Sequence, residues 1–181
     1  MSYSFAWATY VRENPQRSNK HDTHAAPGRS TMAEGVFRSL AKNNPHIAEI
    51  DSCGTGAYHT LDPPDYRTMA TLKKNGITDY DHGARQVSQE DFNDFDYIFA
   101  MDGMNLRDLL KMQRRVESRG QKSKARVMLL GEYSGKGRAE EVVDPYYGAD
   151  NGFDTVFGQV KRFSVNFLKA LEEGSSTGSS S

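Results

Sequence analysis

The segment "YIFAMDGMNLRDLLKMQRRVES", from Tyr97 to Ser118, decides the fold class because it joins an apolar strand to a helix. "YIFAM" is apolar at every position, which is typical of a strand buried on both faces of a parallel sheet. The helical pattern begins at Asn105, and Asp102 in the short connection is predicted to cap that helix. A strand followed directly by a helix indicates an α/β domain.

The same alternation of strand and helix recurs along the chain. Two more strands are predicted at 47–52 and 126–130, and further helices at 30–40, 65–76 and 153–168. Gly76 closes its helix at the position where a left-handed glycine is common. The expected fold is a small doubly wound, three-layer α/β domain, whose ligands bind beyond the carboxyl ends of the strands.

Composition excludes several classes of protein. The 181 residues carry 23 Lys and Arg against 24 Asp and Glu, a net charge of −1 that argues against a general binder of nucleic acid or membranes. No apolar run is long enough to span a bilayer, and no secretory signal pattern opens the chain. Cys53 is the only cysteine, which suits a reducing compartment, so a cytoplasmic location is predicted. No metal-ligand spacing occurs, and no cofactor is expected.

The stretch "RSTMAEGVFRSL", from Arg29 to Leu40, predicts a helix aimed at an anion. Ser30 or Thr31 is the expected cap, and free N–H groups at a helix start favour phosphate. The planar fork of Arg29 suits contact with two phosphate oxygens. The alternative is a solvated arginine near a helix start.

The stretch "VVDPYYGADNGF", from Val142 to Phe153, places a carboxyl group on an extended loop before the last helix. Asp144 there suits a general acid for a leaving oxygen and then a base for water. Tyr146 and Tyr147 beside it suit the wall of a pocket for a flat substrate. The alternative is an ordinary turn, because D-P and N-G pairs mark turns in many proteins.

Together with "IDSCGTGAYH" and "DFDYIFAMDGMNLRDL", these stretches resemble the low molecular weight protein tyrosine phosphatases in their fungal form. The resemblance runs from Arg29 to about Glu173. It implies a four-stranded parallel sheet and hydrolysis of phosphotyrosine and aryl phosphate monoesters through a cysteinyl-phosphate intermediate. The implied partners are phosphotyrosine proteins or small aryl phosphates, and the implied signature is C-x5-R-S.

The resemblance assigns roles to individual residues. Arg29 matches the arginine that holds the phosphate oxygens, and Asp144 matches the general acid. The other matches contact the substrate or nucleophile (Ser30, Tyr58, Tyr146 and Tyr147) or support the phosphate loop (Ser52 and His82).

The nucleophilic cysteine of the family is absent. Its position, six residues before Arg29, is occupied by Thr23. The loop reads "HAAPG" instead of a glycine-rich cradle, and Pro27 has no N–H to donate. The chain is therefore predicted to be inactive or severely impaired. The alternative function is a catalytically inactive phosphatase-like binding module, or a truncated or mis-spliced variant of an active enzyme.

Four residues are weaker hypotheses for a substitute nucleophile. Thr23 has no evident base to activate it. His21 and His24 lie in no supporting pattern, and solvated histidines are the ordinary case. Cys53 follows the second predicted strand, where a small structural cysteine is more common than a displaced nucleophile.

Three segments are expected: an irregular N-terminal segment at 1–28, a phosphatase-like domain at 29–173, and a disordered Gly/Ser tail at 174–181. "FAWATYV", from Phe5 to Val11, is the only candidate for the missing first strand. The basic stretch "KMQRRVESRGQKSKAR" is expected to be a solvated helix end, and becomes a candidate docking surface only if its charges gather on one face.

Overall fold

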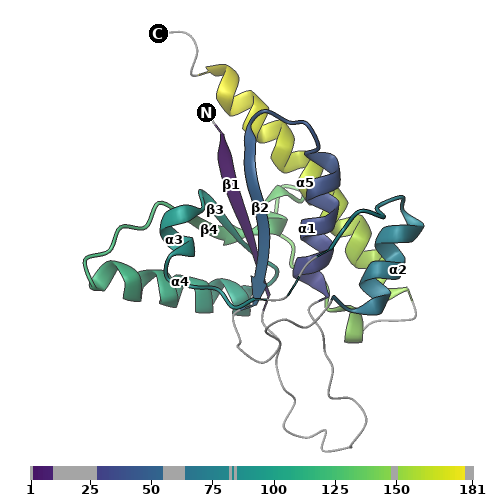
Figure 1. The fold of residues 1–181 in the computed structure, drawn as a ribbon, viewed down its shortest axis with the longest axis horizontal. Helices are drawn as coiled ribbons and strands as arrows, with labels where there is room; N and C mark the ends of the chain where they lie inside the picture. Colours follow the sequence, from purple (N-terminus) through teal and green to yellow (C-terminus); the bar gives the residue numbers. More distant parts are fainter. Residues whose placement is uncertain are drawn as a thin grey trace, which may run out of the picture.

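The computed structural model describes residues 2–9, 28–54, 64–81, 83, 85–147 and 151–177 of the chain. A four-stranded parallel sheet lies at its centre, in the order β2-β1-β3-β4 (Figure 1). The strands are Tyr3–Thr9 (β1), Ile47–Gly54 (β2), Tyr97–Ala100 (β3) and Arg126–Leu129 (β4). The helices are Arg29–Leu40 (α1), Tyr66–Lys74 (α2), Asp91–Asp94 (α3), Gly103–Ser118 (α4) and Gly152–Thr177 (α5), with 3₁₀ turns at Leu130–Tyr133 (η1) and Pro145–Tyr147 (η2).

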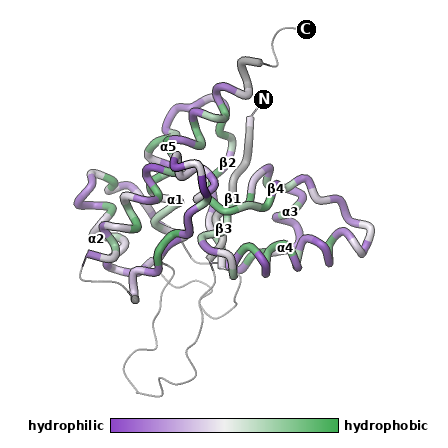
Figure 2. Tube along the Cα trace, turned by 180° about the vertical axis from the view of Figure 1, so that it is seen from behind, coloured by the Kyte–Doolittle hydropathy of each residue, from purple (hydrophilic) through white to green (hydrophobic). Residues whose placement is uncertain are grey.

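Helices cover both faces of the sheet, which confirms the predicted three-layer α/β fold. The alternation of side chains along β3 divides the core. Tyr97 and Phe99 belong to the cluster under α1 and α5, where the Phe99 and Phe167 rings lie 4.9 Å apart. Ile98 and Ala100 belong to the cluster under α3 and α4. Along α4, hydrophilic and hydrophobic residues alternate, as expected for a helix with one face on the sheet (Figure 2).

The first strand corrects the expectation of an irregular segment at 1–28. β1 pairs with β2 from Tyr3 to Thr9 and with β3 from Phe5 to Ala8, so it fills the central position of the sheet. A gap there would leave backbone groups of both neighbouring strands without hydrogen-bond partners, which is costly. The apolar N-terminal run fills that position, and residues 10–27 lie outside the described part.

Several element boundaries were predicted correctly and others were not. Gly76 has a φ of +82°, which confirms the left-handed stop, and Asp102 caps α4 by accepting the N–H of Asn105 at 2.8 Å. Helix α1 begins at Arg29 with Gly28 as its N-cap, so Ser30 and Thr31 are helical residues and not caps.

The predicted disordered tail at 174–181 is wrong for its first four residues. Helix α5 continues to Thr177, because an established helix adds further residues at little cost. Residues 178–181 lie outside the described part. No helix in the described ranges is long and apolar enough to cross a membrane.

Candidate phosphate site

Arg29 lies at the first position of α1, beside the carboxyl ends of the central strands. Its side chain is only 10 % exposed. The guanidinium Nη2 lies 2.8 Å from Asp102 Oδ2, and Nη1 donates to the Val142 carbonyl at 3.0 Å. Two neighbouring segments therefore fix the direction of the Arg29 fork.

Asp102 follows β3 and connects the Arg29 fork to the start of α4. One carboxylate oxygen accepts the Asn105 N–H and caps the helix, while the other pairs with Arg29. A single carboxylate thus both caps the start of α4 and holds the Arg29 guanidinium in place. Sequence reasoning identified its capping role but missed the ion pair, which depends on the parallel arrangement of the strands.

Asp144, the predicted general acid, lies two residues after the carbonyl that Arg29 holds. Its Oδ1 accepts the backbone N–H of Tyr146 at 3.1 Å, which closes a tight turn around Pro145. The side chain is half-buried. That the Asp144 carboxylate and the Arg29 guanidinium share one cleft stays a prediction.

Tyr146 forms a fixed wall with residues of α2. Its hydroxyl donates to Asp65 Oδ2, and Asp65 receives two hydrogen bonds from the Arg67 side chain, at 3.1 and 2.9 Å. The Arg67 guanidinium lies 4.6 Å from the centre of the Tyr146 ring, and Phe153 packs against that ring edge-on. Sequence reasoning missed Asp65 and Arg67, although "DYR" at a predicted helix start is a capping signal.

The same contacts shift two pKa values in this cluster. Burial acts to raise the pKa of Asp65, but hydrogen bonds from Arg67 and Tyr146 outweigh it and lower that pKa. Burial and the neighbouring Asp65 carboxylate raise the pKa of Tyr146. The wall therefore holds an ionised carboxylate and a neutral phenol at ordinary pH.

The Tyr146 ring lies beside the backbone that leads into Arg29. A Cβ on Gly28 would lie 3.8 Å from Tyr146 Cε2 and 3.6 Å from Thr68 Oγ1, and the Thr68 hydroxyl donates to the Gly28 carbonyl at 3.3 Å. The structure thus brings one of the predicted aromatic side chains next to Gly28, the residue before Arg29.

Ser52, a predicted loop-supporting residue, takes part in a buried network centred on Glu34. The Ser52 hydroxyl donates to Glu34 Oε2 at 2.6 Å, and the Tyr80 hydroxyl donates to the same oxygen at 2.9 Å. The other carboxylate oxygen lies 2.7 Å from Arg38 Nη2. This network joins α1 to the end of β2, and Glu34, which is 0 % exposed, was missed by sequence reasoning. The signal that could have revealed Glu34 is its position, because it is an acidic residue on the apolar face of α1.

Cys53 faces the opposite side of the sheet from Arg29. Because successive side chains alternate, Ser52 points to α1 and Cys53 points into the cluster under α3 and α4. It is 3 % exposed, and burial raises the pKa of its thiol despite the opposing effect of Arg85. These features agree with the structural role expected for Cys53.

Three predicted residues, Thr23, Tyr58 and His82, lie outside the described part, and so does the side chain of Tyr147. Ser30, the remaining match, is buried in the first turn of α1. In the described ranges, no group of three or more His, Cys, Asp or Glu side chains is arranged to hold a metal ion.

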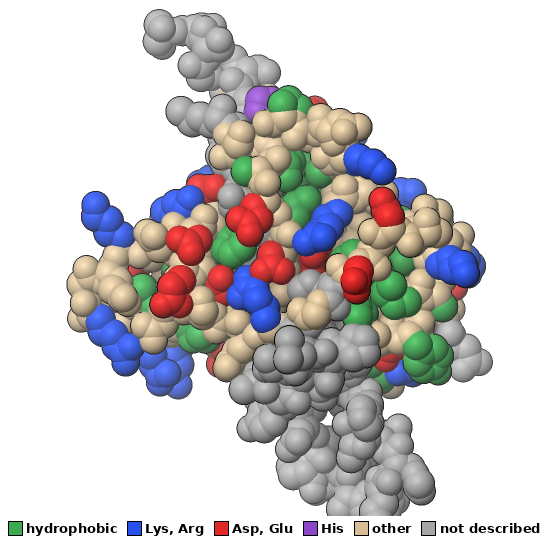
Figure 3. All heavy atoms as spheres, in the orientation of Figure 1, with side chains coloured by type: hydrophobic (Ala, Val, Ile, Leu, Met, Phe, Trp, Pro, Cys, Tyr) green, Lys and Arg blue, Asp and Glu red, His purple; other side chains and the backbone are tan. Residues whose placement is uncertain are grey.

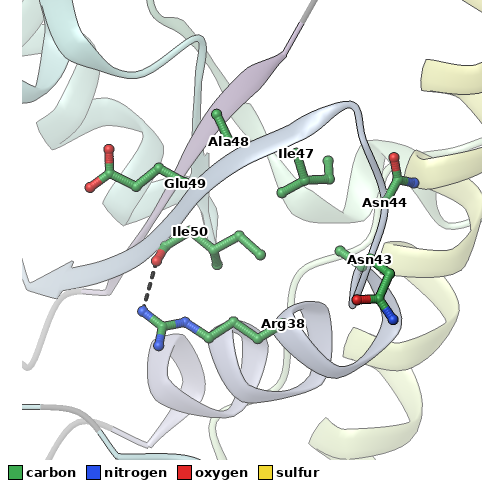
Figure 4. Close-up of a pocket in the computed structure, with 8 residues that line it drawn as sticks. Arg38, Asn43, Asn44, Ile47, Ala48, Glu49 and Ile50 are labelled. Atoms are coloured by element: carbon green, nitrogen blue, oxygen red, sulfur yellow. Dashed lines mark hydrogen bonds between the residues drawn. The ribbon is translucent and has the colours of Figure 1, made fainter.

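An open hollow of about 460 Å³ lies between the end of α1 and the start of β2, at the opposite end of the strand from Gly54 (Figure 4). Arg38 lines it and donates to the Ile50 carbonyl at 2.8 Å. Because Arg38 also pairs with Glu34, we assign Arg38 to the buried network and not to the phosphate site.

The chain matches known proteins along most of its length. The family model "Low molecular weight phosphotyrosine protein phosphatase" matches residues 24–177. The protein of that name from Schizosaccharomyces pombe is 49 % identical, over 79 % of this chain and 89 % of its own length. The protein of that name from Homo sapiens is 42 % identical, over 78 % of this chain and 87 % of its own length. A protein tyrosine phosphatase from Entamoeba histolytica superposes with a TM-score of 0.73 at 27 % identity, over 96 % of this chain and 99 % of its own.

The structural match covers more of the chain than these two sequence matches do. This difference agrees with β1, which lies in the sheet although the family model matches only residues 24–177. The extent of the family match and the identity to its members lead to one conclusion: the chain belongs to the low molecular weight phosphotyrosine protein phosphatase family.

Proposed function

We propose that this chain binds phosphotyrosine and aryl phosphate monoesters without hydrolysing them. The observation that carries the proposal is a separation of roles: Arg29 is held by Asp102 at the carboxyl ends of the strands, whereas the only thiol is buried behind the sheet. We place this activity in the cytoplasm, where a lone thiol stays reduced.

The binding half of the site rests on Arg29, Ser30 and Tyr146. A helix start with a fixed arginine fork favours a phosphate dianion. The Tyr146 ring beside Gly28 offers an apolar surface to the aryl group. Tyr58 and Tyr147 are assigned to the same wall, as the family resemblance implies.

The catalytic half retains a general acid but no attacking group. Asp144 would protonate a leaving phenol, a contribution of about 10²–10⁴-fold, only after a nucleophile has attacked phosphorus. Thr23 occupies the cysteine position, and a threonine hydroxyl without a base is a poor nucleophile. The loop-supporting roles of Ser52 and His82 then serve binding alone.

The test measures binding and turnover separately. Phenylphosphonate, which cannot be hydrolysed, should bind saturably in a calorimetric titration, and Arg29→Lys, which keeps the charge and removes the fork, should weaken that binding at least about tenfold. Hydrolysis of p-nitrophenyl phosphate should equal the buffer rate. Thiol-sensitive turnover that Cys53→Ser abolishes would overturn the proposal, and so would the absence of phosphonate binding by a folded chain.

A further inference from the structure

Helix α4 carries a basic stripe on its solvent-facing side. We define the α4 stripe as Arg107, Lys111, Arg114 and Arg115, all of them exposed. Their spacing of four, three and one residues places them on one face of a helix. Three basic residues of the stretch from Lys111 to Arg126, together with Arg107 before it, therefore gather on one face of α4, as a docking surface requires.

In the described part of the chain, the basic side chains of the stripe are not held in ion pairs, although the Glu141 carboxylate lies close to Arg107 at the start of α4. Within the described ranges, none of its four side chains forms an ion pair with an Asp or Glu. The acidic residues of α4, Asp108 and Glu117, lie at the two edges of the stripe by helical position. Lys and Arg side chains follow the lower left edge of the molecule in Figure 3, where Figure 1 draws α4.

The stripe begins next to the phosphate site. Asp102, the N-cap of α4, pairs with Arg29, so the helix axis leads directly away from the arginine. With a rise of 1.5 Å per residue, Arg107 lies about 8 Å along the axis from Asp102, and Arg115 about 20 Å. An extended peptide covers about 3.3 Å per residue, so this interval corresponds to about two to six residues.

We propose that the α4 stripe binds an acidic segment lying about two to six residues from the phosphotyrosine in a partner protein. The proposal rests on the proposed function and adds the class of phosphoprotein that the site prefers. An anionic membrane is the less suitable occupant, because interfacial helices insert apolar side chains. The exposed large hydrophobic residues of the described part are Tyr66, Val143 and Tyr146, and none lies on α4.

The experiment compares two labelled peptides of equal length, each with one phosphotyrosine. One carries Asp and Glu at positions two to six from the phosphotyrosine, and the other carries Ser and Asn there. Fluorescence anisotropy at 20 mM salt should give about fivefold to tenfold tighter binding of the acidic peptide, and 300 mM salt should remove most of that preference.

Charge reversal at Lys111→Glu and Arg114→Glu should abolish the preference and leave the affinity for the neutral peptide unchanged. The matched control, Lys161→Glu and Lys169→Glu on α5, makes the same charge change at two exposed sites and should keep the preference. An unchanged preference in the α4 variant would overturn the proposal.

Failure of the stripe and failure of the phosphate site give different results. If the neutral phosphopeptide binds and acidic residues add nothing, the stripe proposal is wrong and the proposed function stands. If an otherwise identical acidic peptide without the phosphate binds as tightly as the acidic phosphopeptide, phosphate contributes nothing to binding, and both the proposed function and the stripe proposal that rests on it are wrong. Binding of vesicles containing phosphatidylserine, without any peptide preference, would assign the stripe to a membrane and overturn the proposal.

Discussion

Replacing Glu34 with alanine tests whether the buried network holds α1, and with it Arg29, against the sheet. The carboxylate is 0 % exposed and accepts hydrogen bonds from Ser52 at 2.6 Å and Tyr80 at 2.9 Å. A hydrogen bond to a charged acceptor contributes about 1.5–3 kcal/mol. Removal of the shared acceptor should therefore lower the free energy of unfolding by about 3–5 kcal/mol, since the two losses are not fully additive.

Two substitutions separate the parts of this effect. Glu34→Gln keeps one acceptor oxygen and the side-chain shape, so it should cost about 1–2 kcal/mol. The pair with Arg38 should contribute little, because the Arg38 side chain is 46 % exposed and solvent screens it. Glu49→Ala on the exposed face of β2 is the matched control and should change stability by less than about 0.5 kcal/mol.

The assay is equilibrium unfolding in urea, with the m-value checked for two-state behaviour. A Glu34→Ala variant within about 1 kcal/mol of the original chain would refute the reasoning, because the cost of an unmet buried hydrogen bond is at least that large. Equal losses for the alanine and glutamine variants would also refute it, since they would show that the acceptor oxygen has no part in the effect.

Burial and the Glu34 carboxylate raise the pKa of Tyr80 above 10.0, so the folded chain keeps a proton that the unfolded chain loses at high pH. The free energy of unfolding should therefore fall by up to about 1.4 kcal/mol per pH unit above pH 10. Tyr80→Phe should reduce that slope in urea titrations at alkaline pH. Asp102→Asn removes the charge opposite Arg29 but keeps a good cap, whereas Asp102→Ala also removes the cap and should cost about 1 kcal/mol more in the same unfolding assay. A Cβ at Gly131 would lie 1.7 Å from a backbone oxygen, so Gly131→Ala should lower the melting temperature markedly, while Gly158→Ala, with nothing within 4 Å, should leave it unchanged or raised.

The sequence predicted the fold well where apolar periodicity was continuous. β3 and the helix after it were placed within two residues, because their patterns match the periods of a strand and a helix. β1 was the exception. Its sequence does not match the family's, so its place in the centre of the sheet depends on pairing with two strands that are distant in the chain.

For the candidate site, the sequence indicates the residue types but not the contacts between them. Arg29 and Asp144 follow from local motifs, whereas the Arg29–Asp102 pair joins elements 73 positions apart and has no local signal. Asp65 and Arg67 were missed for the same reason, because the wall they form with Tyr146 depends on how α2 packs beside η2.

The most direct test of the account places a cysteine at the C-x5-R position before Arg29 and leaves the rest of the chain intact. In a chimera, residues 10–28 are replaced by a cysteine and five loop residues, so that β1 ends at Thr9 and the loop leads into Arg29 in the C-x5-R pattern. The account predicts hydrolysis of p-nitrophenyl phosphate at least about 10³-fold above the same chimera with serine for that cysteine. It also predicts no turnover by the original chain or by its Thr23→Cys variant. Equal rates for the cysteine and serine chimeras, or turnover by the original chain at the rate of the cysteine chimera, would contradict it.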